Sequence, residues 1–149
     1  MKICIASSAG GHLSESLKLL PILKGHNVFF FTFHSKHIGN SILGHKVYYT
    51  VDPKRNIIKF FNVFSDSFKV FGRENPDLII STGANVAVPI SLIGKCNGKK
   101  LIHIECGAQV DTPSLTGRVL YPFADLFIVR WRALLQKYGK KAIYGGLSI

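Results

Sequence analysis

The residues best suited to chemistry lie in three short polar loops, each directly after an apolar run of strand length. The first loop reads SSAGGH at residues 7–12 and leads into a segment of helical character. Two consecutive glycines let backbone N–H groups approach an anion closely, and a helix beginning there adds the positive end of its dipole. Ser8, Gly10 and Gly11 are therefore predicted to bind a phosphate or diphosphate. The alternative is a tight turn between strand and helix.

His12 closes this first loop, beside the predicted anion site. A protonated imidazole there can donate to a phosphate, and a neutral one can accept a proton from an attacking hydroxyl. His12 is therefore our first candidate for a catalytic base. A histidine that merely lies at the surface would give the same sequence.

The other two loops read STGAN at residues 81–85 and ECGAQVDT at 105–112. The hydroxyl, glycine and amide of Thr82, Gly83 and Asn85 predict substrate binding, although helix capping explains Asn85 equally well. Glu105 places a carboxylate at the end of an apolar strand, which is costly unless the carboxylate is paired. It is either hydrogen-bonded within the protein or available to substrate, and it is our second candidate for the base.

Strand-like runs alternate with helix-length segments along the chain, which is typical of a parallel sheet covered by helices. We predict a single α/β domain over residues 1–149, with a Rossmann-like, open, mainly parallel sheet and helices on both faces. Ligands bind at the carboxyl ends of such strands, where the three loops would meet. The strands are expected at 2–7, 27–32, 47–50, 78–81, 100–105, 126–129 and 142–144, and the helices at 13–24, 54–73, 85–96, 114–121 and 131–138.

One predicted helix, at residues 54–73, has two chemically distinct sides at 3.6 residues per turn. We expect its apolar arc to pack on the sheet; the alternative is a basic amphipathic helix lying at a lipid surface. The apolar arc contains Ile57, Phe60, Phe61, Phe64, Phe68 and Phe71, and the opposite side contains Lys54, Arg55, Lys59, Asn62, Asp66, Lys69 and Arg73.

The composition points to an anionic partner and a peripheral membrane protein. Nineteen Lys and Arg against eight Asp and Glu leave a net charge of +11, which suits nucleic acid, anionic lipid or a phosphorylated substrate. The three cysteines, Cys4, Cys96 and Cys106, lack paired metal-ligand spacing, so we predict no disulfide framework, metal or cofactor. No signal peptide or membrane-length apolar run is evident, so we expect a cytoplasmic protein.

The loops in their order resemble the asparagine-linked-glycosylation fourteen family. The likeness rests on SSAGGHLSE at 7–15, STGAN at 81–85 and YPFAD at 121–125 followed by Trp131, and it runs to YGGL at 144–147. Members of that family, with bacterial relatives in capsule and exopolysaccharide synthesis, are the membrane-associated subunits of two-part glycosyltransferases.

The resemblance implies the N-terminal lobe of a GT-B glycosyltransferase, with a separate subunit that binds the UDP-sugar donor. It implies an inverting transfer of N-acetylglucosamine or another hexose to a polyprenyl-diphosphate-linked saccharide, on the cytoplasmic face of an anionic membrane. Gly10, Gly11 and His12 would face the acceptor diphosphate, and residues 144–149 would lie toward the partner. Because the chain is short, we expect it to be inactive alone.

Two other functional classes fit the sequence less well. The charge would suit a nucleic-acid-binding α/β domain, but no recognised module is visible and the Phe residues have core-like spacing. A self-sufficient Rossmann enzyme is disfavoured, because the first loop lacks both the G-x-G-x-x-G spacing and the lysine of a P-loop. We therefore expect no nucleic-acid partner.

Overall fold

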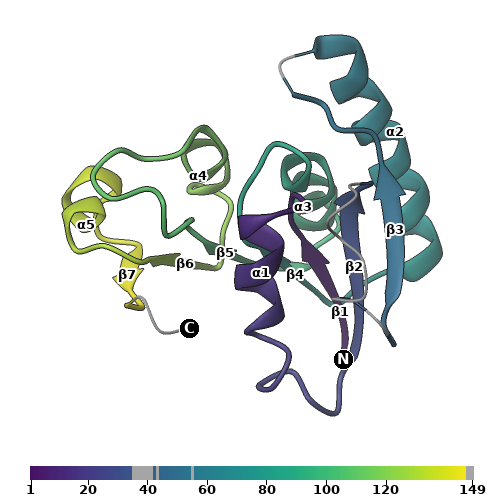
Figure 1. Cartoon of the computed structure of the whole chain (residues 1–149), viewed down its shortest axis with the longest axis horizontal. Helices are drawn as coiled ribbons and strands as arrows, with labels where there is room; N and C mark the ends of the chain where they lie inside the picture. The colour runs from purple at the N-terminus through teal and green to yellow at the C-terminus, as the bar shows by residue number, and fades with distance from the viewer. Residues whose placement is uncertain (35–41, 43, 55, 147–149) are drawn as a thin grey trace.

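The computed structural model describes residues 1–34, 42, 44–54 and 56–146, and seven strands of this part form one sheet (Figure 1). The strand order is β3-β2-β1-β4-β5-β6-β7, and all the described pairs of neighbours are parallel. This confirms the predicted Rossmann-like sheet. The strands are β1 (Lys2–Ala6), β2 (Asn27–Phe33), β3 (Lys46–Thr50), β4 (Leu78–Ser81), β5 (Lys100–Ile104), β6 (Leu126–Val129) and β7 (Ala142–Tyr144).

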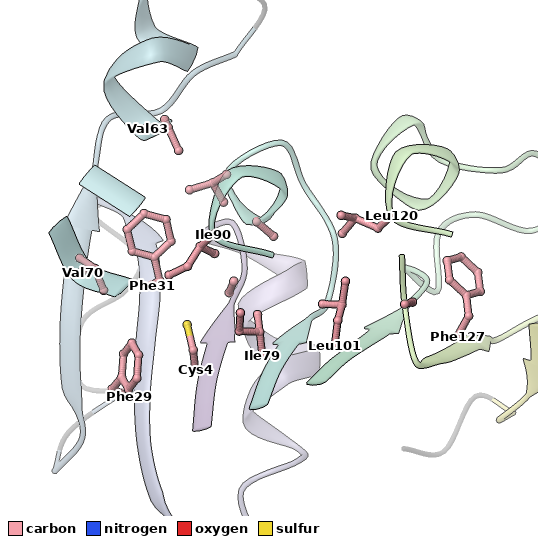
Figure 2. Packing of buried hydrophobic residues seen from close by; sticks show 14 of the residues in the cluster. Cys4, Phe29, Phe31, Val63, Val70, Ile79, Ile90, Leu101, Leu120 and Phe127 are labelled. Atoms are coloured by element: carbon pink, nitrogen blue, oxygen red, sulfur yellow. The ribbon is translucent and has the colours of Figure 1, made fainter. Parts of the chain in front are cut away.

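Two hydrophobic clusters, one on each face of the sheet, hold the helices in place. Alternate residues of a strand point to opposite faces, so Cys4 lies in one cluster and Ile5 in the other. Figure 2 shows the first cluster, where Phe31, Ile79 and Leu101 meet helical side chains. That cluster contains residues of α2 (Ile57–Glu74), α3 (Ala87–Cys96), α4 (Leu115–Leu120) and α5 (Ala133–Tyr138), whereas α1 (Gly11–Leu17) contributes to the other.

The first helix is shorter than the predicted segment 13–24. It ends at Leu17, and the chain continues in turns such as Leu20 N–H to the Leu17 carbonyl at 3.1 Å. Pro21 explains the end, because its ring nitrogen has no hydrogen to donate and the ring crowds the carbonyl four residues earlier. That carbonyl belongs to Leu17, so the helical hydrogen-bond pattern cannot pass this point.

The expectation that the Phe arc of the predicted helix 54–73 packs on the sheet is largely wrong. Helix α2 buries Val63, Ser67, Val70 and Phe71, a stripe about a quarter turn away from the centre of the Phe arc. The α2 side chains left exposed include Ile57, Ile58, Phe61 and Phe68, at 72%, 70%, 69% and 55% of their surface. Arg55, assigned to the opposite side, lies outside the described residues.

Helix length explains the exposure of the first turns, whereas Phe68 is exposed because the buried stripe lies on another side of the helix. An 18-residue helix is about 27 Å long, whereas a five-residue strand spans about 17 Å. The first turns of α2 therefore extend past the carboxyl end of β3, where no sheet covers them (Figure 1). Across the described residues, no helix combines the length and apolar character needed to cross a membrane.

Candidate functional site

The carboxyl ends of β1 and β4 bring the first two loops together. The strands pair directly, with Ala6 opposite Ser81, and Thr82 N–H donates to the Ala6 carbonyl at 3.3 Å. Two further hydrogen bonds join Thr82 to His12: the Thr82 hydroxyl donates to the His12 carbonyl at 3.2 Å, and His12 Nδ1 lies 2.8 Å from the Thr82 carbonyl oxygen. Two segments 70 residues apart thus form one site.

The contact with Thr82 selects the tautomer of His12. A carbonyl oxygen can only accept, so Nδ1 carries the proton and donates it to Thr82. The neutral ring then keeps a lone pair on Nε2, which is the arrangement a general base needs. The ring is partly exposed and packs against Gly83, where an added Cβ would lie 2.8 Å from His12 Cε1.

Two features therefore require glycine at position 83: the backbone conformation there and the nearby His12 ring. Its φ is +109°, a conformation that residues with a Cβ rarely adopt. Replacing Gly83 with alanine is expected to lower the free energy of unfolding by about 2–3 kcal/mol, because backbone strain and the His12 clash add together. Urea unfolding measures this. Gly98→Ala is the matched control, since Gly98 has φ +72° with no atom within 4 Å, and should cost only about 1 kcal/mol.

Cys106 and Glu15 join His12 at the carboxyl ends of the strands. Neither was predicted from the sequence as a site residue. One ligating atom from each of the three side chains lies within 4.8 Å of the other two. The hydrogen bond with Cys106 raises the pKa of His12 against the opposing effect of burial. The same hydrogen bond lowers the pKa of the Cys106 thiol. The cluster is therefore electrostatically coupled.

Backbone and side-chain contacts hold Glu15 and the third loop in place. Gly107 N–H donates to Glu15 Oε1 at 3.2 Å, and Arg130 Nη2 lies 4.0 Å from Glu15 Oε2. Trp131 Nε1–H donates to the Gly107 carbonyl at 2.7 Å. The loops after β5 and β6 are thus joined to α1. Cys106 and Arg130 lie just after β5 and β6. This position after parallel strands was the sequence signal that could have identified them.

The structure places Glu105, the second candidate for the base, in the interior of the protein. Its side chain is 0% exposed, and Tyr138 Oη–H donates to Oε2 while Cys106 N–H donates to Oε1 at 3.2 Å. Burial and the hydrogen bond to Glu105 raise the pKa of Tyr138. The backbone of Gly117 packs close to the carboxylate, so substrate cannot approach from that side. Of the two alternatives, hydrogen bonding within the protein or availability to substrate, these contacts favour the first for Glu105.

A second test separates a structural from a catalytic Glu105. Tyr138→Phe removes one hydrogen bond to the buried carboxyl group and should lower the free energy of unfolding by about 1–3 kcal/mol. Activity per folded molecule should stay unchanged. Chemical denaturation and an assay of the sugar transfer that the family resemblance implies measure the two quantities, with Tyr49→Phe as the control because Tyr49 is 47% exposed. A large loss of activity without loss of stability would support a catalytic role for Glu105.

Ser8 and Asn85 lie on the other side of the strand ends, in a groove of about 280 Å³ that Phe33, Pro53 and Lys54 also line. The capping explanation for Asn85 is wrong: the cap residue of α3 is Val86, and Asn85 Nδ2–H donates to the Lys54 carbonyl at 3.2 Å. A neighbouring pocket of about 270 Å³ is mainly apolar, and Lys54 and Asn85 line it as well. Its apolar lining residues are Ile57, Phe60, Val88, Leu115 and Val119.

Comparison with known proteins identifies the relatives of this chain. A family model described as "Oligosaccharide biosynthesis protein Alg14 like" matches residues 48–147. The UDP-N-acetylglucosamine transferase subunit ALG14 of Rattus norvegicus is 30% identical over 175 aligned positions, covering 96% of this chain and 81% of the relative. The Homo sapiens protein of the same name is 38% identical over 85 positions, which cover 53% of this chain but only 39% of that protein.

Solved structures with the same fold include a glycosyltransferase and sugar-nucleotide epimerases. MurG of Acinetobacter baumannii matches with a TM-score of 0.68 and 18% identity, over 87% of this chain and 41% of that chain. MnaA of S. aureus, solved with UDP, matches with a TM-score of 0.75 and 14% identity, over 99% of this chain and 45% of that chain. The chain therefore spans less than half of either structure, and these likenesses establish its fold.

Proposed function

Because this chain belongs to the family of Alg14-like oligosaccharide biosynthesis proteins, we propose that it is the acceptor-binding, membrane-associating subunit of a two-component inverting glycosyltransferase. The reaction transfers N-acetylglucosamine or another hexose from a UDP-sugar to a polyprenyl-diphosphate-linked saccharide. The observation that carries this proposal is the position of His12. Its Nδ1 is tied to Thr82, so Nε2 is the nitrogen that meets Cys106 and that would accept a proton from an acceptor hydroxyl taking the place of the thiol.

The two grooves suit the two halves of a lipid diphosphate. The apolar pocket between α2, α3 and α4 fits a polyprenyl chain, and the groove beside Ser8 is more polar. Lys54 and Asn85 line both, which puts a cation and an amide at the junction where a diphosphate would lie. Gly10, with φ +90° and no atom within 4 Å of a Cβ position, leaves its backbone open to the anion.

His12 would then act on the acceptor sugar. With the diphosphate held near the glycine loop, the acceptor hydroxyl would donate its proton to Nε2 while its oxygen attacks the anomeric carbon of the donor. The bond from that carbon to the UDP oxygen breaks on the opposite face, so the configuration inverts. The donor itself would be held by the second subunit.

The need for a second subunit is supported by the word "subunit" in the names of the curated relatives. The β7 edge of the sheet offers a surface for it. Ile143 and Tyr144 are 47% and 43% exposed there, and the guanidinium carbon of Arg132 lies 4.5 Å from the centre of the Tyr144 ring. Residues 147–149 of the predicted partner segment lie outside the described residues.

Membrane association would use the exposed apolar face of α2, which begins at Ile57 and includes Phe68. Ile57, Ile58 and Phe61 are each more than two-thirds exposed, and Lys59 is exposed beside them. An apolar surface next to basic side chains binds the headgroup region of anionic membranes. Because the apolar pocket begins at Ile57, a lipid acceptor could enter it directly from the membrane.

Reconstitution tests the proposed function. The purified chain is mixed with a candidate donor-binding subunit and vesicles containing a polyprenyl-diphosphate-linked N-acetylglucosamine, and transfer from radiolabelled UDP-N-acetylglucosamine and other UDP-hexoses is followed. Transfer is expected only when both proteins are present. A chain that transfers sugar equally fast alone would contradict the two-component proposal. If no UDP-sugar supports transfer by the co-purifying pair, the proposed reaction is wrong.

A further inference from the structure

Three side chains of the kinds that bind zinc meet beside the strand ends. His12 and Glu15 come from α1, and Cys106 comes from the loop after β5. Their ligating atoms all lie within 4.8 Å of one another. We propose that His12, Glu15 and Cys106 form a binding site for a divalent transition-metal ion, Zn²⁺ above all. Cysteine spacing could not suggest this site, because Cys106 lies more than 90 residues from His12 and Glu15 in the sequence.

The geometry is near that of a four-coordinate site. Zinc bonds of about 2.0–2.3 Å to nitrogen, oxygen and sulfur place tetrahedral ligand atoms about 3.3–3.8 Å apart. All separations in the cluster are within 4.8 Å, so they exceed this range by at most about 1 Å, which rotation of partly exposed side chains can close. Three protein ligands leave a fourth position for water or a substrate oxygen.

Neighbouring groups already hold two of the ligands in place. The hydrogen bond from His12 Nδ1 to the Thr82 carbonyl leaves Nε2 as the metal-binding nitrogen, an arrangement common at zinc sites. Gly107 N–H holds Glu15 Oε1 at 3.2 Å, which leaves the other oxygen for the ion. Such preorganisation lowers the conformational entropy lost when an ion binds.

The charge and ligand types favour Zn²⁺ over Mg²⁺ or Ca²⁺. A thiolate and an imidazole are ligands for zinc and cobalt, whereas the two hard cations need mostly oxygen. Binding displaces the thiol proton of Cys106, so the ligands carry two negative charges. Arg130 is the nearby cation that opposes the ion, since its Nη2 lies 4.0 Å from Glu15 Oε2, and one positive charge offsets only half of the ligand charge.

A bound ion would also regulate the proposed function. It would bind His12 Nε2, the atom that takes the proton of the acceptor hydroxyl in the proposed reaction. Zn²⁺ would therefore inhibit sugar transfer. This consequence depends on the proposed function. The metal site itself does not, and it is tested on the chain alone without a transferase assay.

Cobalt serves as the spectroscopic probe. The reduced, chelator-treated chain is titrated with Co²⁺, and Zn²⁺ is then added in competition. We expect a thiolate-to-cobalt charge-transfer band and the intense visible bands of a four-coordinate ion, saturating at one Co²⁺ per chain and abolished by Zn²⁺. An absent charge-transfer band at saturating Co²⁺ would overturn the proposal.

Variants assign the ligands. Cys106→Ser should abolish the charge-transfer band and weaken Zn²⁺ binding at least about 100-fold, while Glu15→Gln should weaken it about 10- to 100-fold. Cys96→Ser is the matched control, because Cys96 is an exposed free cysteine outside the cluster, and should bind as the unmodified chain does. Circular dichroism verifies that each variant is folded. Equal Zn²⁺ affinity in Cys106→Ser and the unmodified chain would contradict the site.

Discussion

Replacing His12 with glutamine is expected to lower kcat of the reconstituted transferase about 100- to 10,000-fold, the usual contribution of a positioned general base. Glutamine is about as long as histidine and keeps an amide N–H donor, which lies one bond further from Cβ than the Nδ1 that contacts Thr82. The amide cannot take up a proton at neutral pH, however, and the acceptor hydroxyl must then attack without assistance. Radiolabel transfer with saturating donor and acceptor measures kcat directly.

The pH dependence gives a second readout of the same residue. Only neutral His12 can accept a proton, so kcat/KM should rise as the pH increases through its pKa. Cys106 raises the pKa of His12 from its ordinary value of 6.5, so the rise should be centred above pH 6.5. Assays contain a chelator, which keeps metal ions from occupying the ring. His12→Gln should lose this limb of the profile.

His26→Gln is the control for both measurements. His26 is exposed in the turn before β2, at the amino ends of the strands and therefore away from the site. Its substitution should leave the rate and the pH profile unchanged. If His12→Gln lowers the rate no more than His26→Gln does, the base belongs to the partner subunit. The role of His12 in this chain would then be limited to binding.

The second large effect is expected at the membrane. Replacing Phe61 and Phe68 together with serine should weaken binding to anionic vesicles about 100-fold, because a partly buried aromatic ring contributes about 1.4 kcal/mol and the two contributions add. Both side chains are more than half exposed, so folding should be unaffected. Vesicle sedimentation at fixed salt concentration measures the partition coefficient.

Ile22→Ser is the matched control. Ile22 is 73% exposed, but it lies between α1 and β2, away from the strand ends that bear the proposed membrane surface. Equal vesicle binding by the Phe variant and by Ile22→Ser would show that α2 does not form the membrane-binding surface. Steeply salt-dependent binding to a generic oligonucleotide, without a preference for anionic vesicles, would instead support the nucleic-acid-binding alternative.

Much of the sheet followed from local patterns. All seven strands occur within one residue of their expected bounds, because short apolar runs bounded by turns reflect local backbone preference and burial. The meeting of His12, Thr82 and Gly83 followed from a topological rule, since neighbouring parallel strands end at the same side of the sheet. These features depend on residues near in sequence or on the order of strands.

Other features could not be predicted in this way. The Phe arc of α2 fits a buried helix face equally well, and its exposure depends on which side of the helix faces the sheet and on how far the helix extends past β3. Glu105 and Cys106 are adjacent and both polar, yet one points into the core against Tyr138 and the other meets His12. Which of two neighbours enters the core depends on strand twist and on distant side chains, which carry no local signal.

The sequence alone therefore determined the Rossmann-like class, the family resemblance and the loops that carry the candidate site, because these are encoded in hydrophobic periodicity and ordered motifs. Only the tertiary structure decided which side chains of those loops touch. It separated Glu105 from the site, brought Glu15 and Cys106 to His12, and left the Phe residues of α2 exposed. Contacts between residues 90 positions apart depend on the packing of whole elements, and that packing is set by the complete fold.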